Sequence, residues 1–310
     1  MATRSRGTSG TVPLVTAVLA SMWVWAPAAW AQLDVEALIR SGDAAWAARA
    51  EGHDGRGLAA EEPIARAIRA YEAAVALDPD RLGAHWRYVR ALFFEGEYAH
   101  SEPDARQASF DRAAAASNAA FEALARRSSD AKALRRNDPE RTRAAFAAKL
   151  HPDVARIHFW SALAWGARGR YYGILDGVRN GVARRLYRYA EVTIALEPTL
   201  AHGGPHRLMA SLQQRVPRIP FLTGWVDKDR ILPELERAMA IAPDFPGNQL
   251  LYAHTLLDLA PERREEARAL LNQVAALEPD PSEVVEQLEM RESARETLAE
   301  QFNQPTLHAP

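Results

Sequence analysis

Apolar residues recur every three or four positions along most of the chain after residue 32, which is the spacing of one face of an α-helix. Between residues 61 and 77, for example, Ile64, Ile68 and Tyr71 fall on one such face. Alanine, leucine, arginine and glutamate dominate these stretches, and all four residue types favour helices. The pattern predicts an all-α protein.

The predicted helices follow one another closely, separated by short polar or glycine-containing turns. We expect them at residues 34–50, 61–77, 81–94, 101–126, 182–196, 228–241, 247–259, 262–277 and 281–301, with an aromatic helix from residue 152 and a short helix that ends at residue 216. Ser101 is expected to cap its helix, after a turn closed by Gly96 and Tyr98. Prolines and a glycine exclude a regular helix at 216–225.

Four of the predicted helices end in a similar hexapeptide whose last residue is proline. The four are Ala-Val-Ala-Leu-Asp-Pro at 74–79, Thr-Ile-Ala-Leu-Glu-Pro at 193–198, Ala-Met-Ala-Ile-Ala-Pro at 238–243 and Val-Ala-Ala-Leu-Glu-Pro at 274–279. Proline lacks an N–H and pushes the preceding residue out of the helical region, so each helix must stop there. The prolines are 119, 45 and 36 residues apart. A regular tetratricopeptide repeat (TPR) has a period of about 34 residues, so we predict a degenerate TPR-like helical solenoid of about ten to twelve helices.

The start of the chain has the pattern of a secretory signal peptide. Arg4 and Arg6 precede an apolar run at 12–25, and small residues at Ala29 and Ala31 mark a cleavage site before residue 32. A retained membrane anchor is the alternative, although the run is shorter than the roughly 20 residues that span a bilayer. We therefore expect a periplasmic protein.

The predicted organisation has five parts. They are a signal peptide at 1–31, N-terminal TPR-like helices at 32–126, a charged linker and short helix at 127–150, a TPR-like array at 151–302 and a disordered tail at 303–310. Residues 126–138 carry charge without an apolar stripe, so we expect a mobile segment that divides the N-terminal helices from the rest.

Charge is distributed unevenly behind a formal net charge of −2. Residues 126–190 hold 15 Lys and Arg against 5 Asp and Glu, whereas residues 244–302 hold 13 acids against 5 bases. Such polarity can steer an anionic ligand or let two copies of the chain associate, while the plainer interpretation is the solvated faces of amphipathic helices. A neutral, exported chain is not expected to bind nucleic acid.

Enzyme signatures are lacking in the sequence. It contains no Gly-x-Ser-x-Gly, His-Glu-x-x-His, Walker loop or dinucleotide fingerprint, and it contains no cysteine, which excludes disulfides, thiolate metal sites and lipid attachment to a cysteine. His151 with His158, and His202 with His206, have spacings that would allow a metal site, but structural or exposed histidines are favoured. We predict a protein that is not an enzyme and has no metal or cofactor.

One constellation of side chains suggests a ligand site. It lies in the second half of the aromatic helix and consists of Trp160, Trp165, Arg168, Arg170, Tyr171 and Tyr172. Aromatic walls with guanidinium groups suit a carboxylate on an apolar body, because the arginine fork matches the carboxylate oxygens. The alternative is an ordinary core stripe with arginines reaching out from its edge.

Residues 65–280 carry an ordered series of motifs. These are Phe-Trp-Ser-Ala-Leu-Ala-Trp-Gly at 159–166, Ala-Leu-Glu-Pro at 195–198, Gly-Gly-Pro-His-Arg-Leu at 203–208, Arg-Val-Pro at 215–217 with Gly224, and the segments 234–246 and 248–257. The series resembles the T component of tripartite ATP-independent periplasmic (TRAP) transporters, a TPR-like family. One departure is that members are often lipoproteins, whereas residues 29–32 here offer no cysteine.

The resemblance implies a non-enzymatic accessory that docks the transporter's solute-binding protein and holds an organic-acid or apolar ligand in a pore through the helical array. The alternative is a general TPR scaffold for protein–protein interaction in envelope assembly, with no ligand of its own.

Overall fold

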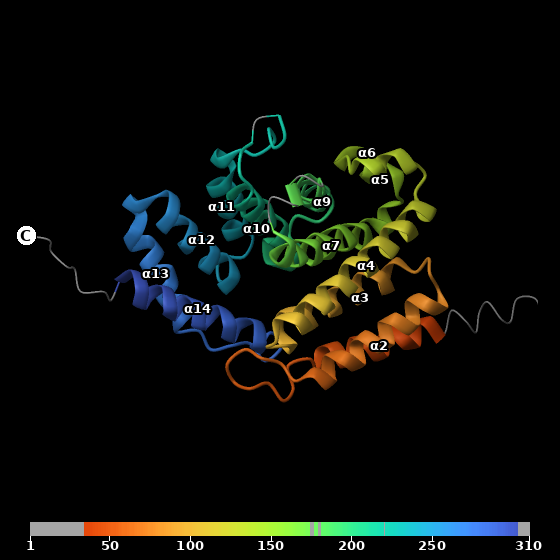
Figure 1. Ribbon diagram of the computed structural model, residues 1–310, viewed down its shortest axis with the longest axis horizontal. Coiled ribbons are helices and arrows are strands. Elements are labelled where there is room, and N and C mark those ends of the chain that lie inside the picture. Colours follow the sequence, from red (N-terminus) through yellow and green to blue (C-terminus); the bar gives the residue numbers. More distant parts are fainter. Residues whose placement is uncertain (1–33, 174–176, 179–180, 220, 303–310) are drawn as a thin grey trace, which may run out of the picture.

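A computed structural model describes residues 34–173, 177–178, 181–219 and 221–302 (Figure 1). All regular secondary structure in these residues is helical, so the predicted all-α class is confirmed for this part of the chain. None of the described helices is long and apolar enough to cross a membrane. The predicted signal peptide and C-terminal tail lie outside the described residues.

The helices follow in quick succession. Residues 34–47 are helical, and after them come α2 (Glu61–Leu77), α3 (Leu82–Phe94), α4 (Pro103–Arg127), α5 (Ala131–Arg136), α6 (Pro139–Ala145), α7 (His151–Tyr172), α9 (Val182–Leu196), α10 (Leu200–Arg215), α11 (Ile231–Ile241), α12 (Pro246–Leu259), α13 (Arg264–Ala275) and α14 (Val284–Phe302). The predicted ranges 61–77 and 182–196 coincide with α2 and α9. Helices α2, α9, α11 and α13 end shortly before the four prolines, as predicted.

Two local predictions between α3 and α4 are wrong. Glu95–Ala99 is a π-helical turn that continues α3, where we expected the helix to end at residue 94 and a turn closed by Gly96 and Tyr98 to follow. A Cβ at Gly96 would lie 2.7 Å from the ring of Phe110, so the glycine allows close packing of that ring. Helix α4 begins at Pro103 with Glu102 as its N-cap residue, and no side chain caps it. Pro103 suits the first helical position, because its φ is already helical and the N–H it lacks would have no partner within the helix.

Residues 126–138, the expected mobile linker, instead contain α5 and contribute to the core. Leu134 of α5 is buried in one cluster with Leu82, Leu124 and Ile157, which come from α3, α4 and α7. Two apolar side chains, those of Ala133 and Leu134, anchor this otherwise charged segment. The N-terminal helices therefore share their core with the helices that follow α5.

Neighbouring helices in the sequence are mostly neighbours in space, from α2 with α3 through to α13 with α14 (Figure 1). The last helix then returns to the start of the array. The side chain of Arg49 donates hydrogen bonds of 2.7 and 3.0 Å to Glu286 on α14, and Val285 is buried among Ile64 and Leu92. This array is also closed by a contact between residues 237 positions apart.

Candidate functional site

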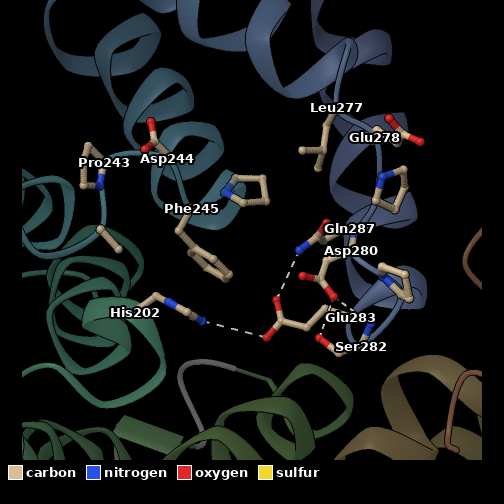
Figure 2. Close-up of a pocket in the computed structure, with 14 residues that line it drawn as sticks. His202, Pro243, Asp244, Phe245, Leu277, Glu278, Asp280, Ser282, Glu283 and Gln287 are labelled. Carbon is tan, nitrogen blue, oxygen red and sulfur yellow. Dashed lines mark hydrogen bonds and ion pairs between the residues drawn. The ribbon is translucent and has the colours of Figure 1, made fainter.

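One concave site lies where several helices end and begin (Figure 2). It has a volume of about 790 Å³ and is lined by His202, residues 242–246, residues 277–283 and Gln287; we call it the proline hollow. Two of the four proline-terminated helix ends, at Pro243 and Pro279, lie in its walls. Successive helices of the array bring these ends together, because α11, α12 and α13 pack side by side.

An aromatic pair forms one wall of the proline hollow. The rings of His202 and Phe245 are stacked, with centroids 4.4 Å apart and an angle of 14° between the planes. The Nε2 of His202 lies 3.9 Å from Oε1 of Glu283, whose other oxygen accepts a hydrogen bond of 3.2 Å from Gln287 (Figure 2). The pair offers a flat apolar surface next to a carboxylate.

The position of His202 depends on an unusual backbone. Ala201, His202 and Gly203 all have left-handed φ angles, of 48°, 59° and 81°. This region is costly for residues other than glycine and persists only where the surroundings enforce it. The guanidinium of Arg207 donates hydrogen bonds of 2.8 Å to the carbonyls of Ala201 and His202, and Asn248 donates one of 3.1 Å to that of His202. Burial lowers the pKa of Arg207 to about 10.

Carboxylates give the proline hollow a negative character. Asp244, Glu278, Asp280 and Glu283 line it. The carboxylate of Asp280 accepts hydrogen bonds of 2.6 and 2.7 Å from the hydroxyl and backbone N–H of Ser282, and these lower the pKa of Asp280. Such a surface favours a cationic group against the aromatic pair and disfavours a free organic acid.

The six residues predicted from the sequence lie elsewhere, between residues 160 and 172 of α7, and their partners come from α3, the π-helical turn, α4 and α9. The two arginines of this group are already paired within the chain. Arg168 lies 2.5 Å from Asp111, and both outer nitrogens of Arg170 bond to Glu97. Burial disfavours the charge of Arg170, but the bond to Glu97 outweighs it and raises the pKa. A carboxylate ligand would have to displace these partners.

The four aromatic members of the predicted group do not form one surface. Trp160 packs against Phe93 and Phe159 in the core. Tyr171 packs on the ring of Phe110, and Tyr172 contacts Arg168, whose guanidinium lies 4.0 Å from its ring centre. Trp165 lies under the guanidinium of Arg185 at 4.4 Å. The structure thus brings Arg168 together with Tyr172 and with Trp165, whose ring centre lies 5.4 Å from the guanidinium of Arg168, and leaves Trp160 apart from them. None of the six residues lines the two hollows described in this section.

A second hollow, of about 470 Å³, lies between the end of α5 and the first turns of α9. It is lined by Arg136, Asn137, Gly181, Arg184, Arg185 and Arg188, and we call it the arginine hollow. Sequence reasoning noted the basic character of residues 126–190 but named none of these arginines as a site. The available signal was the arginine cluster that follows Gly181 at the start of a predicted helix.

A buried histidine, His158, contacts Asn137, one of the residues that line the arginine hollow. One ring nitrogen of His158 lies 2.8 Å from the carbonyl oxygen of Val154, and the other lies 3.3 Å from the side-chain oxygen of Asn137. The imidazole is fully buried, which lowers the pKa of His158 to about 4. His158 is therefore neutral in the folded protein near neutral pH.

We expect the free energy of unfolding to fall by about 2 kcal/mol between about pH 7 and pH 5 because of His158. The folded-state pKa of about 4 lies below the ordinary value of about 6.5, so the unfolded chain binds the proton first as the pH falls. Urea unfolding of the wild type and of His158→Phe at both pH values measures this change. Phenylalanine keeps the ring against Phe121 and removes the titration, so an equal fall in both proteins would contradict the prediction.

The histidine pairs considered for a metal site have separate partners. His151 lies 3.0 Å from the carbonyl oxygen of Arg143, and His206 lies 2.7 Å from Glu234. His158 and His202 have the contacts given above. Within the described part of the chain, no group of three or more histidine and acidic side chains is arranged to hold a metal ion.

The sequence matches no model of a known protein family and no curated protein sequence.

Proposed function

We propose that the chain is a non-enzymatic periplasmic accessory protein, similar to the T component of TRAP transporters, which docks a solute-binding protein and holds an organic-acid or apolar ligand. A TPR-like arrangement of the helices is part of this proposal. Support comes from the motif series at 159–257, from the sequential packing of α2 to α14 and from the proline-terminated helix ends.

The observation that carries the docking proposal is the proline hollow. Three separate segments of the chain build it, so its shape depends on the folded array rather than on one flexible loop. Its stacked ring pair provides an apolar anchor point, and its carboxylates surround that point with negative charge. An aromatic centre with a polar rim is the usual composition of a protein interface. A lysine or arginine on the solute-binding protein would suit this surface.

One observation favours the alternative, a general TPR scaffold for envelope assembly without a ligand. The ion pairs of Arg168 with Asp111 and Arg170 with Glu97 occupy the guanidiniums that the sequence suggested for a ligand. A scaffold would use the hollows for protein contacts alone. The two proposals differ in whether a small molecule is bound.

Docking is tested by titrating the chain from residue 32 onward with the TRAP solute-binding protein of the same organism in isothermal titration calorimetry. We expect Phe245→Ala and Glu283→Lys each to weaken the complex about tenfold or more, since both alter the centre of the proline hollow. Glu265→Lys is the matched control, because Glu265 is an exposed acid on α13 outside the hollow.

Absence of a complex with the wild-type chain would refute docking of that protein. Equal weakening by Glu283→Lys and Glu265→Lys would show general charge attraction and would refute the proline hollow as the docking site. Native mass spectrometry of the wild type distinguishes the ligand-holding protein from the general scaffold. A stoichiometric bound small molecule supports the ligand-holding function, and a chain without one supports the scaffold.

A further inference from the structure

Four of the residues that line the arginine hollow are arginines. Arg184, Arg185 and Arg188 come from the first two turns of α9, and Arg136 comes from the end of α5. Guanidinium groups are planar, always charged and able to donate two parallel hydrogen bonds to one oxyanion. The hollow has a volume of about 470 Å³, within the range of about 300–1,000 Å³ typical of small-molecule pockets.

The placement of these arginines contradicts the usual rules of helix electrostatics. The N-terminal end of a helix carries partial positive charge and favours acidic residues, but the first turn of α9 contains none. Arg184 and Arg188 are four positions apart, where two like charges repel each other on a helix surface. A sequence that breaks local rules in one place usually does so at a functional site.

The backbone at this point adds further donors for an anion. Gly181 precedes α9 with a φ of 71°, and it has no side chain that could cap the helix. The first N–H groups of a helix have no partner within the helix, and with the helix dipole they form a common anion-binding arrangement. The helix start and the guanidinium groups thus favour the same kind of ligand.

Two of the hollow's side chains are already held in position. Arg185 stacks on Trp165, and its Nε is buried without a hydrogen-bond partner among the described residues. Asn137 is about nine-tenths buried and is held by His158 below the hollow. Within the same described residues, Glu191 is the one carboxylate that pairs with a guanidinium of the hollow, through Arg188 at 2.6 Å. Most of the positive charge is not neutralised by these contacts.

We propose that the arginine hollow is a binding site for a small dianion, of the dicarboxylate or phosphate class. Both classes present paired oxygens that match the guanidinium fork. This proposal specifies the ligand-holding part of the proposed function and rests on that function. It places the organic-acid site on α9, whereas the sequence suggested α7. It needs no contact with the proline hollow.

The test is isothermal titration calorimetry of the chain from residue 32 onward with succinate, inorganic phosphate and acetate at constant ionic strength. We expect succinate or phosphate to bind with one site per chain and acetate to bind at least about tenfold more weakly. The double variant Arg184→Gln with Arg188→Gln should lower the affinity for the dianion at least about tenfold. Arg56→Gln is the control, because Arg56 is highly exposed and distant in sequence from the hollow.

Further variants keep the test decisive. Arg136 belongs to α5, and Arg136→Gln should also lower the affinity for the dianion. A folding defect in α9 cannot explain both results. Arg188→Lys keeps the charge but loses the fork, and we expect intermediate affinity. Phe245→Ala should leave dianion binding unchanged, which separates failure of this site from failure of docking.

Tighter binding of phosphate than of succinate would assign the site to phosphate compounds, and the reverse order would assign it to dicarboxylates. The proposal is overturned if neither dianion binds the wild type. It is also overturned if Arg56→Gln weakens binding as much as the double variant, because the attraction would then come from net charge alone.

Discussion

Replacing Glu234 with alanine should lower the free energy of unfolding by about 1–3 kcal/mol, the usual cost of leaving a buried hydrogen-bonding group, here His206, without its partner. The side chain of Glu234 is 1% exposed. It accepts hydrogen bonds from His206 at 2.7 Å, Arg230 at 3.0 Å and Arg237 at 2.8 Å. The substitution leaves these donors around an empty space between α10 and α11. Urea unfolding near neutral pH measures the loss.

The control for Glu234 lies on the same helix. Glu236 is exposed; it makes a loose ion pair with Arg263, at 3.8 Å, and accepts a long hydrogen bond of 3.3 Å from the hydroxyl of Tyr252, so Glu236→Ala should change the free energy of unfolding by about 1 kcal/mol or less. Similar losses in the two variants would show that the buried cluster is not a special source of stability.

The contribution of Glu234 and its three partners should also appear in the pH dependence of the free energy of unfolding at acid pH. Burial alone would raise the pKa of Glu234, but the hydrogen bonds from His206 and Arg230 and the charge of Arg237 outweigh it and lower the pKa. The stabilisation is then fully present above the ordinary glutamate pKa of about 4.3 and is lost as the pH falls through the folded-state value. Glu234→Gln should therefore lose less stability than the wild type over the same acid range.

Replacing Gly203 with alanine should lower the free energy of unfolding by about 2–5 kcal/mol, from two separate causes. The residue has a φ of 81°, which is unfavourable for any residue with a Cβ. An added Cβ would also lie 3.0 Å from the Cα of Ala238 on α11, which is backbone and cannot simply rotate away. The substitution should therefore separate α10 from α11. Thermal and urea unfolding measure the effect.

Gly181 provides a matched comparison for Gly203. Its φ of 71° is similar, but a Cβ there would meet no atom within 4 Å. Gly181→Ala should cost about 1–2 kcal/mol, the conformational part alone. The difference between the two variants isolates the contact with Ala238, and equal losses would show that this contact does not matter.

Local features of the chain were sufficient to predict most helix boundaries. The apolar spacing and the Leu-Glu-Pro end predicted 182–196, which is the observed α9, because periodicity and a proline act within a few residues. The π-helical turn at Glu95–Ala99 was missed, since the close contact of Gly96 with Phe110 arises only when α4 packs on α3. The burial of Leu134 was missed because Leu134 and its neighbour Ala133 are too few to make a periodic pattern.

For the candidate sites, too, the sequence reported only on residues that are close together in the chain. Sequence reasoning selected Arg168 and Arg170 because arginines beside aromatic residues suit a carboxylate. Their carboxylate partners, Asp111 and Glu97, are 57 and 73 residues away, so the pairing could not be recognised in the sequence. The proline hollow was missed for a related reason, since its walls come from segments as far apart as His202 and Gln287.

The amino-acid sequence by itself determined that the chain is helical, where most helices stop and which segments are basic or acidic. These properties depend on residues within one or two helical turns of each other, or on composition alone. Only the tertiary structure decided which charges neutralise one another and which line a hollow. It also decided that Arg49 and Glu286 close the array, because ion pairs and cavities depend on distances between atoms that the packing of many helices sets together.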